Sequence, residues 1–232
     1  MQAILMSLNI GKILELGDKN STDPLKKAYK SAIIKNSIKG ALRCESEGFV
    51  GDFVADTKHH GGRDKAVFAN ACSNYAFWEE FLGLKNMPLG GMGENLSIKG
   101  LDETSVYVGD WHQIGSIVLE VSQPRKPCFT LCRRWGRADF AKEIFKSGRG
   151  GWYYRVVQTG ECRAGDEIKI VKKAKIRLSI AQINREFYAP SSKEILEKIQ
   201  ALEAQNILAG EYSKAIKARL DNSYDDTYMH QA

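Results

Sequence analysis

The chain of 232 residues lacks the marks of a membrane or secreted protein. No apolar run approaches the roughly 18 residues that a membrane-spanning helix needs. The hydrophobic start, MQAILMSLNIGKILELG, has no basic region or small-residue cleavage site, and Asn9 and Gly11 interrupt it, so we do not expect a signal peptide. The five cysteines are an odd number without a CxxC pair, which disfavours a disulfide framework and a ribbon-type zinc site. These absences predict a reduced, cytoplasmic protein.

The composition is that of an ordinary folded chain, with 43% hydrophobic and 27% charged residues. At roughly 150 residues per domain, the length allows one large domain with or without a small appendage. The net charge of +6 is unevenly placed: residues 175–232 hold eight basic and eight acidic side chains, whereas residues 123–155 hold nine basic and two acidic ones. Such a dense basic segment indicates an anionic partner, either a phosphorylated small molecule or a nucleic acid.

Residues 4–173 consist mainly of short extended segments separated by glycines. Strands are expected within 65–69, 91–100, 105–123, 152–158 and 167–172. Helices are expected at 73–83 and 138–147. Residues 24–37 fit a helix or a strand equally well, so both remain open.

The last sixty residues have a different pattern, that of three short amphipathic helices. Capping boxes at Ser179–Gln182 and Ser191–Glu194 begin the first two, and a third follows Gly210. We therefore expect a domain at 1–174 and a helical module at 175–232, with a frayed tail from Asn222.

Cys128 is the first candidate for chemistry. It lies in QPRKPC, where Pro124 and Pro127 favour a stiff, extended backbone. Arg125 and the following lysine precede the thiol, and nearby cations favour the thiolate, which is both a nucleophile and a ligand for soft metals. A small buried core residue explains Cys128 equally well from residue types alone. Cys132 fits either a resolving thiol or a core residue on a turn.

The second candidate is the segment HHGGRDK at 59–65. Adjacent histidines on an extended backbone point to opposite faces and seldom bind one metal together. Gly61 and Gly62 permit the close backbone approach that a phosphate or a ring needs, and Lys65 adds positive charge. Taken alone, the segment fits a glycine turn with a solvated histidine better.

Two glycine-rich loops are weaker candidates. One carries Glu94 and Asn95 after LGGMG, and by itself it is no more specific than any glycine-rich loop. The other, SGRGGWYY, places Arg149 between glycines and before aromatic residues. It could clamp a phosphorylated heterocycle or bind RNA, or it could be a turn that enters a core strand.

Together and in this order, these segments resemble the MOSC family, named after the C-terminal domain of molybdenum cofactor sulfurases. The matching segments are GKI at 11–13, KSAIIK at 30–35, GDFVADTKHHGGRDKAV at 51–67, GENL at 93–96, VYVGD at 106–110, QPRKPC at 123–128 and GRGGWYYRV at 148–156. The resemblance covers about residues 4–220. Within the family, the chain resembles the stand-alone bacterial YiiM-type proteins, in which three short helices follow the MOSC domain.

The resemblance implies a mainly β (α+β), barrel-like domain with peripheral helices and a C-terminal three-helix module. It also implies a molybdenum cofactor, a phosphorylated pterin whose dithiolene holds the metal, with Cys128 ligating molybdenum or carrying sulfur for it. YiiM-type proteins are implicated in detoxification by reducing N-hydroxylated bases and related compounds. Such an oxidoreductase needs an external electron-donor reductase, because nothing in the sequence resembles a flavin, haem or iron–sulfur site.

The resemblance and the charges give a set of candidate site residues. We expect Arg125, Lys65, Lys35 and Arg149 to anchor the anionic pterin, Gly61, Gly62 and Asn95 to shape its pocket, and His60 to donate a proton to the departing hydroxyl. One departure bears on the substrate: relatives commonly carry His-Tyr-Pro where this chain has Ala69-Asn70-Ala71.

Three alternatives remain open: a persulfide carrier for another molybdoenzyme, a non-enzymatic barrel that binds anions or RNA through residues 123–155, and a pocket protein without catalysis. For the enzyme, we expect a small N-hydroxylated substrate and neither a membrane nor a nucleic-acid partner. The C-terminal helices would cover a barrel edge, or dock the electron donor or a second copy of the chain as a homodimer.

Overall fold

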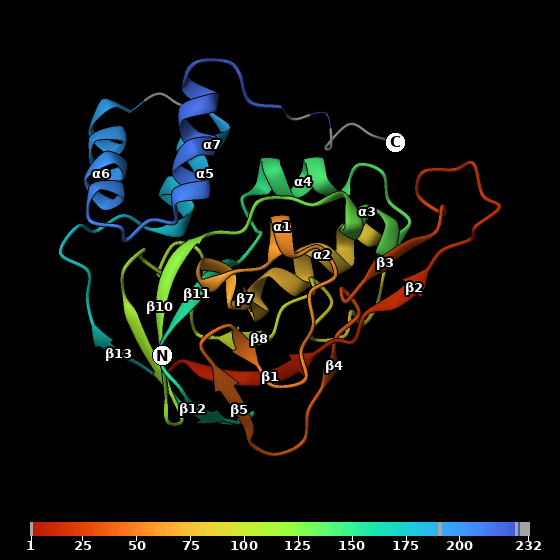
Figure 1. Ribbon diagram of the computed structural model, residues 1–232, viewed down its shortest axis with the longest axis horizontal. Helices are drawn as coiled ribbons and strands as arrows, with labels where there is room; N and C mark the ends of the chain where they lie inside the picture. Colours follow the sequence, from red (N-terminus) through yellow and green to blue (C-terminus); the bar gives the residue numbers. More distant parts are fainter. Residues whose placement is uncertain (1, 190–191, 226, 228–232) are drawn as a thin grey trace.

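An eight-stranded, mostly antiparallel sheet organises the chain, as seen in a computed structural model that describes residues 2–189, 192–225 and 227 (Figure 1). The strand order is β13-β9-β10-β11-β7-β8-β1-β4, and β7 pairs with β8 in parallel. The strands are β1 (Ile4–Ile10), β4 (Asn36–Ser37), β7 (Val67–Ala71), β8 (Leu96–Lys99), β9 (Trp111–Ile114), β10 (Ile117–Pro124), β11 (Trp152–Gln158) and β13 (Ile168–Lys172).

The sheet curls so that its two ends approach each other. Backbone hydrogen bonds from Leu5 N to Asp166 O (3.0 Å) and from Ile168 N to Ala3 O (2.9 Å) join the start of β1 to the start of β13. The fold is therefore mixed α and β around a curled sheet, and the strands within the described residues do not form a closed barrel. Two small sheets complete it: β12 (Gly160–Cys162), β5 (Leu42–Glu45) and β6 (Gly48–Phe49) form one, and β2 (Leu14–Leu16) and β3 (Tyr29–Ser31) form the other.

In Figure 1 the helices lie in the upper and middle parts of the view, and most strands of the large sheet lie below them. The helices are α1 (Thr57–His60), α2 (Tyr75–Leu82), α3 (Phe129–Trp135), α4 (Phe140–Ser147), α5 (Ile180–Tyr188), α6 (Lys193–Ala204) and α7 (Gly210–Leu220), with 3-10 turns at Arg63–Lys65 and Cys72–Asn74. No helix within the described ranges is both long and apolar enough to cross a membrane.

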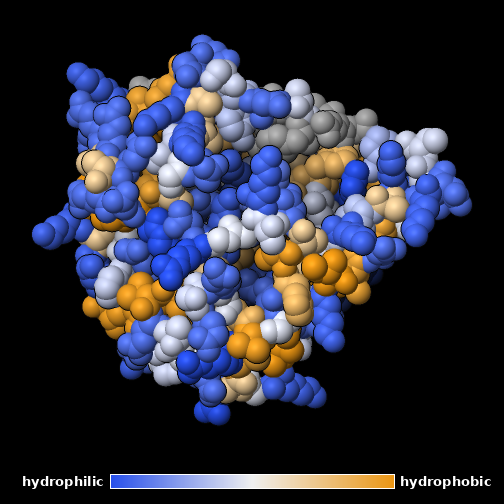
Figure 2. Space-filling model, in the orientation of Figure 1, coloured by the Kyte–Doolittle hydropathy of each residue, from blue (hydrophilic) through white to orange (hydrophobic). Residues whose placement is uncertain are grey.

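Two clusters of buried side chains hold these layers together. The larger one lies on the sheet and includes the inward-facing Leu119 and Val121 of β10. The smaller one, beneath α2, α3 and α4, is centred on Trp78 and Phe140, whose rings meet edge to face at 5.0 Å. Large exposed apolar residues are few, and Figure 2 shows hydrophilic residues over most of one face.

The C-terminal helices share the larger core. Ile183 and Phe187 of α5 belong to the same buried cluster as the β10 side chains. The Ser179 capping box forms with both of its hydrogen bonds, as predicted. The second box falls partly on Ser191, outside the described residues, and α6 begins after Ser192, whose hydroxyl accepts from Ile195 N at 3.3 Å. The tail predicted to fray from Asn222 also lies partly outside the described residues.

Most of the predicted elements are present, with three differences. Residues 24–37 contain no helix; they contain the short strands β3 and β4, but residues 32–35, in the segment SAIIK, belong to neither strand. The helix α3 was not predicted, and it places Cys132 in a buried helical position instead of on a turn. The segment 57–60 is one α-helical turn, so the prediction of an extended backbone at the two histidines is wrong.

Candidate functional site

Cys128 lies where the chain passes from the end of β10 to the start of α3. Its own backbone is extended (φ −142°, ψ 133°), and its carbonyl accepts the first hydrogen bond of α3, from Leu131 N at 3.1 Å. Arg125 N donates to Gly151 O at 3.1 Å, which fixes the start of this crossing against the strand β11. The stiff, extended segment predicted from the two prolines therefore places the thiol at the N-terminus of α3.

The Cys128 thiol contacts two side chains. Its Sγ lies 3.5 Å from His60 Nε2 and 3.3 Å from Thr130 Oγ1. Burial alone would raise the pKa of the thiol, but the hydrogen bond and charge of His60, the charge of Arg125 and the hydrogen bond with Thr130 together lower this pKa to about 6. Cys128 is therefore mainly a thiolate at neutral pH, the form that bonds to soft metals and attacks electrophiles.

The short helix α1 directs the two adjacent histidines to different partners. Asp56 caps the helix: its carboxylate accepts from His59 N at 3.1 Å and contacts His59 Nδ1 at 2.8 Å. These contacts hold His59 on the exposed side, whereas His60 faces Cys128. Gly61 ends the turn where a Cβ would lie 2.8 Å from Thr57 O, and the following Gly62 has a φ of +93° that side chains rarely adopt.

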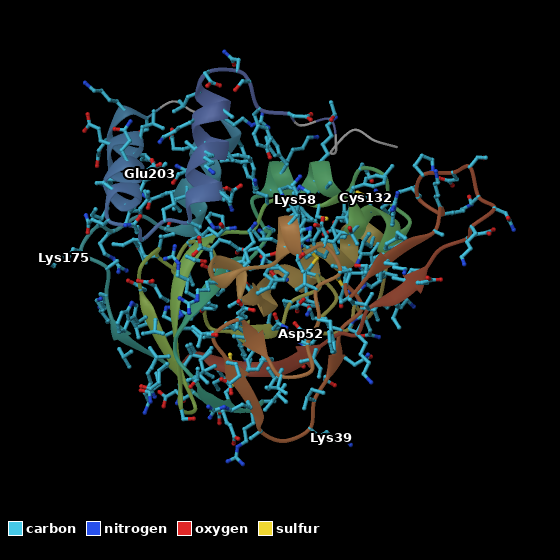
Figure 3. All side chains as sticks on the ribbon, in the orientation of Figure 1. Lys39, Asp52, Lys58, Cys132, Lys175 and Glu203 are labelled. Carbon is cyan, nitrogen blue, oxygen red and sulfur yellow. The ribbon has the colours of Figure 1, made fainter. Side chains whose placement is uncertain are left out.

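Two adjoining cavities, of about 220 Å³ and 440 Å³, meet at this thiol. Cys128, His60, Lys65 and Tyr153 line both of them. We call the smaller cavity the arginine cavity; its wall includes Asp52, which is labelled in Figure 3. We call the larger one the lysine cavity; its wall includes Lys58, also labelled there. Together they reach the size of about 300–1,000 Å³ that is usual for a small-molecule site.

Most predicted site residues meet in the arginine cavity. Its wall includes Cys128, His60, Lys35, Gly61, Gly62, Lys65, Asn95 and Arg125. Arg149 lies elsewhere: its guanidinium is 4.9 Å from the Phe77 ring, and its Nη1 is 3.4 Å from Asn74 Oδ1. The structure thus brings together every predicted site residue except Arg149.

Lys35 forms a buried ion pair that the sequence did not indicate. Its Nζ lies 2.5 Å from Asp52 Oδ1, and the two side chains are 9% and 11% exposed. Burial lowers the pKa of Lys35, while the Asp52 charge opposes that change. Asp52 also accepts from Gly11 N and from the Asn95 amide, each at 2.7 Å. The charge of Lys35 is therefore largely compensated within the protein.

Asn95 uses its side-chain amide to join neighbouring strands. Its Nδ2 donates to Asn9 O at 3.1 Å as well as to Asp52, and its Oδ1 accepts from Phe68 N at 3.1 Å. Because these contacts occupy both ends of the amide, Asn95 shapes the cavity wall through the strands that it holds.

Arg125 differs from the other cations of this wall because part of its guanidinium has no partner. The residue is 3% exposed, and its Nη1 has no hydrogen-bond partner among the described residues. The guanidinium also lies 5.2 Å from the centre of the Phe68 ring. Buried polar groups are normally hydrogen-bonded, so a buried guanidinium with an unsatisfied nitrogen in a cavity wall is suited to an anionic ligand.

The basic segment 123–155 is largely used inside the fold. Arg134 Nη1 donates to Gly90 O at 3.1 Å, and Arg137 Nη1 donates to Phe81 O at 2.8 Å. Arg155 bridges two carboxylates, those of Asp64 and Glu120. The local excess of positive charge is therefore not one continuous cationic surface.

The metal-ligating side chains at this site suit a metal ion that is already bound to an organic cofactor. No group of three or more His, Cys, Asp or Glu side chains within the described residues could hold a bare metal ion. A single thiolate beside an unpaired buried cation instead fits a metal held by an anionic organic ligand.

Most of the chain is similar to known proteins. Residues 56–169 match the MOSC domain. The chain is 34% identical over 183 residues to YflK of Bacillus subtilis (strain 168), covering 78% of this chain and 79% of YflK. It is also 34% identical over 164 residues to a reductase of Gibberella moniliformis (strain M3125 / FGSC 7600), covering 67% of this chain and 28% of that protein.

Among solved structures, that of YiiM from Geobacillus stearothermophilus matches with a TM-score of 0.75 and 27% identity. The match covers 94% of this chain and 99% of that one. This chain therefore belongs to the MOSC family and is a YiiM-type member of it.

Proposed function

We propose that this protein binds the molybdenum cofactor at Cys128 and reduces N-hydroxylated compounds, bases among them, with electrons from an external reductase. The observation that carries the proposal is a thiolate whose pKa is lowered to about 6, facing a cavity whose wall holds the unpaired Arg125. Two comparisons support it: the MOSC family is associated with this cofactor, and one relative is named a reductase.

Three kinds of group in this chain would hold the cofactor. Cys128 is the thiolate ligand, and Arg125 supplies an unpaired cation for the anionic part of the pterin. Lys65, half-buried at the junction of the cavities, adds a second positive charge. Lys35 contributes less direct attraction because Asp52 neutralises it, so we assign it to positioning the wall.

The reaction converts R–NH–OH, two electrons and two protons into R–NH2 and water. The N–O bond breaks, nitrogen gains the electron pair, and the hydroxyl leaves as water. When bound, the molybdenum cofactor supplies the two-electron redox centre, which the external reductase recharges. We assign to His60, whose Nε2 lies 3.5 Å from the Cys128 sulfur, the delivery of a proton to the departing hydroxyl.

Metal analysis with pterin-fluorescence detection tests this function on protein made in a cofactor-competent host. We expect molybdenum and pterin in the wild type, loss of molybdenum in Cys128→Ser, and turnover of an N-hydroxylated base by the loaded wild type. A folded wild type without metal or pterin would overturn the cofactor assignment. A loaded wild type without turnover would overturn the reductase assignment alone.

A persulfide carrier is the second candidate, and the same thiolate favours it. A half-buried, low-pKa cysteine is the nucleophile that accepts sulfane sulfur. This function predicts sulfur on the isolated protein that cyanide removes, and little turnover of N-hydroxylated compounds. Sulfane sulfur that is absent after loading with a sulfur donor would exclude it.

We place this chemistry in the cytoplasm. All five cysteines are unpaired thiols, as expected in a reducing compartment. A low-pKa thiolate is also easily oxidised, so such a compartment protects it.

A further inference from the structure

The lysine cavity has an unused binding group in its wall. Gln123 is 1% exposed, yet its Oε1 has no hydrogen-bond partner within the described part of the chain. An irregularity in the register between Val121 and Gln123 places this residue opposite Tyr153 of β11. Such a bulge redirects a side chain, and bulges are common beside active sites. The side-chain carbonyl of Gln123 therefore has no donor among the described residues.

Two ammonium groups without an ion pair line the same cavity. Lys65 and Lys126 are both half-buried, and neither has a carboxylate within ion-pair distance among the residues described here. Lys65 Nζ donates one hydrogen bond, to His59 O at 2.7 Å. Glu211, which also lines the cavity, pairs instead with Lys214 at 2.9 Å. An anion bound in this cavity would give both ammonium groups a counter-charge.

The rest of the wall suits a flat ring. The side chains of Phe129, Tyr153 and Tyr224 line the cavity, and aromatic faces of this kind stack well on nucleobases. Cys128 and His60 line this cavity and also the proposed cofactor site. One space therefore combines a hydrogen-bond acceptor, two cations, aromatic walls and access to the reacting thiolate.

We propose that the lysine cavity binds an N-hydroxylated nucleotide, with Lys126 on its phosphate, Lys65 as a cation shared with the cofactor site, and the Gln123 carbonyl on a base N–H. This inference rests on the proposed reductase function and specifies its substrate class: the phosphorylated nucleotide in preference to the free base. The N–OH group faces Cys128 and His60. The phosphate takes no part in the two-electron reduction and serves for binding alone.

The cofactor also carries a phosphate, so the two sources must be separated. The phosphate of the pterin would be bound in the arginine cavity by Arg125, whose Nη1 has no hydrogen-bond partner among the described residues. Lys126 lines the lysine cavity and is absent from the wall of the other. A nucleotide that binds the cofactor-loaded protein through Lys126 therefore distinguishes the substrate phosphate from that of the cofactor.

The kinetic test compares N4-hydroxycytidine with its 5′-monophosphate on the loaded protein. We expect kcat/KM to be at least about tenfold higher for the monophosphate, the effect of one charged hydrogen bond. Lys126→Gln should bring this ratio close to one. The matched control is Lys142→Gln on α4, which removes an exposed lysine away from both cavities and should keep the ratio. A wild-type ratio of one, or a ratio unchanged in Lys126→Gln, overturns the nucleotide proposal while the reductase function stands.

A binding test remains informative if the protein reduces nothing. Calorimetric titration with cytidine 5′-monophosphate should give a dissociation constant about tenfold weaker in Lys126→Gln, for both the loaded and the cofactor-free protein. Gln123→Leu should weaken binding of this nucleotide but leave binding of inorganic phosphate unchanged. Binding to the cofactor-free protein alone would mean that the cofactor phosphate occupies the lysine cavity, and would overturn the proposal.

Discussion

The sulfur of Cys128 lies 3.5 Å from Nε2 of His60, although 68 positions separate the two residues in the chain. The contact depends on two local devices. Asp56 caps the single turn of α1 and directs its last residue inward, while the proline-stiffened segment after β10 carries the thiol to the same point. The relationship matters because it stabilises the thiolate despite burial, and it joins the two cavities at one reactive atom.

The reactivity of Cys128 is expected to follow a pKa of about 6. In cofactor-free protein, the rate of alkylation by iodoacetamide should fall as the pH drops through about 6 and level off above about 7. Replacing His60 with Gln removes the imidazole hydrogen bond and charge, so the midpoint should move up toward the ordinary thiol value of about 8.5. Mass spectrometry at Cys128 gives the rate, and buried Cys44, whose pKa is raised to about 12, is the internal control.

The same thiolate makes folding stability depend on pH. Between about pH 6 and 8.5 the unfolded chain keeps the thiol proton that the folded chain has lost, so the free energy of unfolding should rise with pH. This contribution is complete above the unfolded pKa and is lost as the pH falls through 6. Urea titrations of wild type and Cys128→Ser measure it as the difference between the two curves. Parallel curves across this range would contradict the lowered pKa.

Breaking the Lys35–Asp52 pair should destabilise the protein strongly. Asp52→Ala leaves the buried ammonium without its carboxylate and removes the acceptor for Gly11 N. We expect a loss of about 3–5 kcal/mol in the free energy of unfolding. Glu167→Gln is the control, since its pair with Lys169 is exposed and should contribute under about 1 kcal/mol. Equal effects of the two substitutions in urea titrations would show that the buried pair has no special role.

The helical module should unfold together with the sheet because α5 packs into the main core. Ser179→Ala removes the capping box and should cost about 1 kcal/mol. The exposed Ser46→Ala should change little. Calorimetry should show one transition that moves as a whole in Ser179→Ala. Two transitions, with only one of them shifted, would instead mean that 1–174 and 175–232 are separate folding units.

Much of the fold could be predicted from local patterns. Alternating residues around a Gly-Ser turn predicted the hairpin of β9 and β10, and glycine after an amphipathic run predicted the end of α4 at Gly148. The helix α3 was missed because RKPCFTLCRRW has no cap and little amphipathic period, and its start is fixed by the crossing from β10. The curl of the sheet depends on contacts between residues near 4 and 167, which no local pattern encodes.

The sequence indicated which residue types line the site better than which side chains contact each other. Cys128, Arg125 and the glycines followed from their motifs. Asp52, by contrast, is an ordinary acidic residue in the sequence and becomes important because burial pairs it with Lys35. Gln123 gave no signal either, since an unsatisfied carbonyl exists only once the sheet is folded. Arg149 was expected at the site from its flexible neighbours, yet those glycines let it fold back onto Phe77.

Replacing Arg125 should stabilise the cofactor-free protein and weaken its binding of the cofactor. Its guanidinium is buried without a carboxylate, and one of its nitrogens has no partner among the described residues. A buried charge with an unsatisfied nitrogen costs free energy. At about pH 5, where the Cys128 thiol is protonated and no longer compensates the guanidinium, Arg125→Met, which keeps most of the volume, should therefore raise the free energy of unfolding of cofactor-free protein by about 1–3 kcal/mol.

The same variant should lose cofactor, because the anion would then lack its buried cation. Urea titration of the cofactor-free protein and molybdenum content of protein from a cofactor-competent host are measured on the same variant. Arg125→Lys is the control, because it keeps the positive charge but lacks the planar guanidinium. Its cofactor binding and its free energy of unfolding should both lie between those of the wild type and of Arg125→Met. If Arg125→Met is instead less stable and retains molybdenum, then Arg125 is a structural residue whose stacking on Phe68 outweighs its missing hydrogen bond.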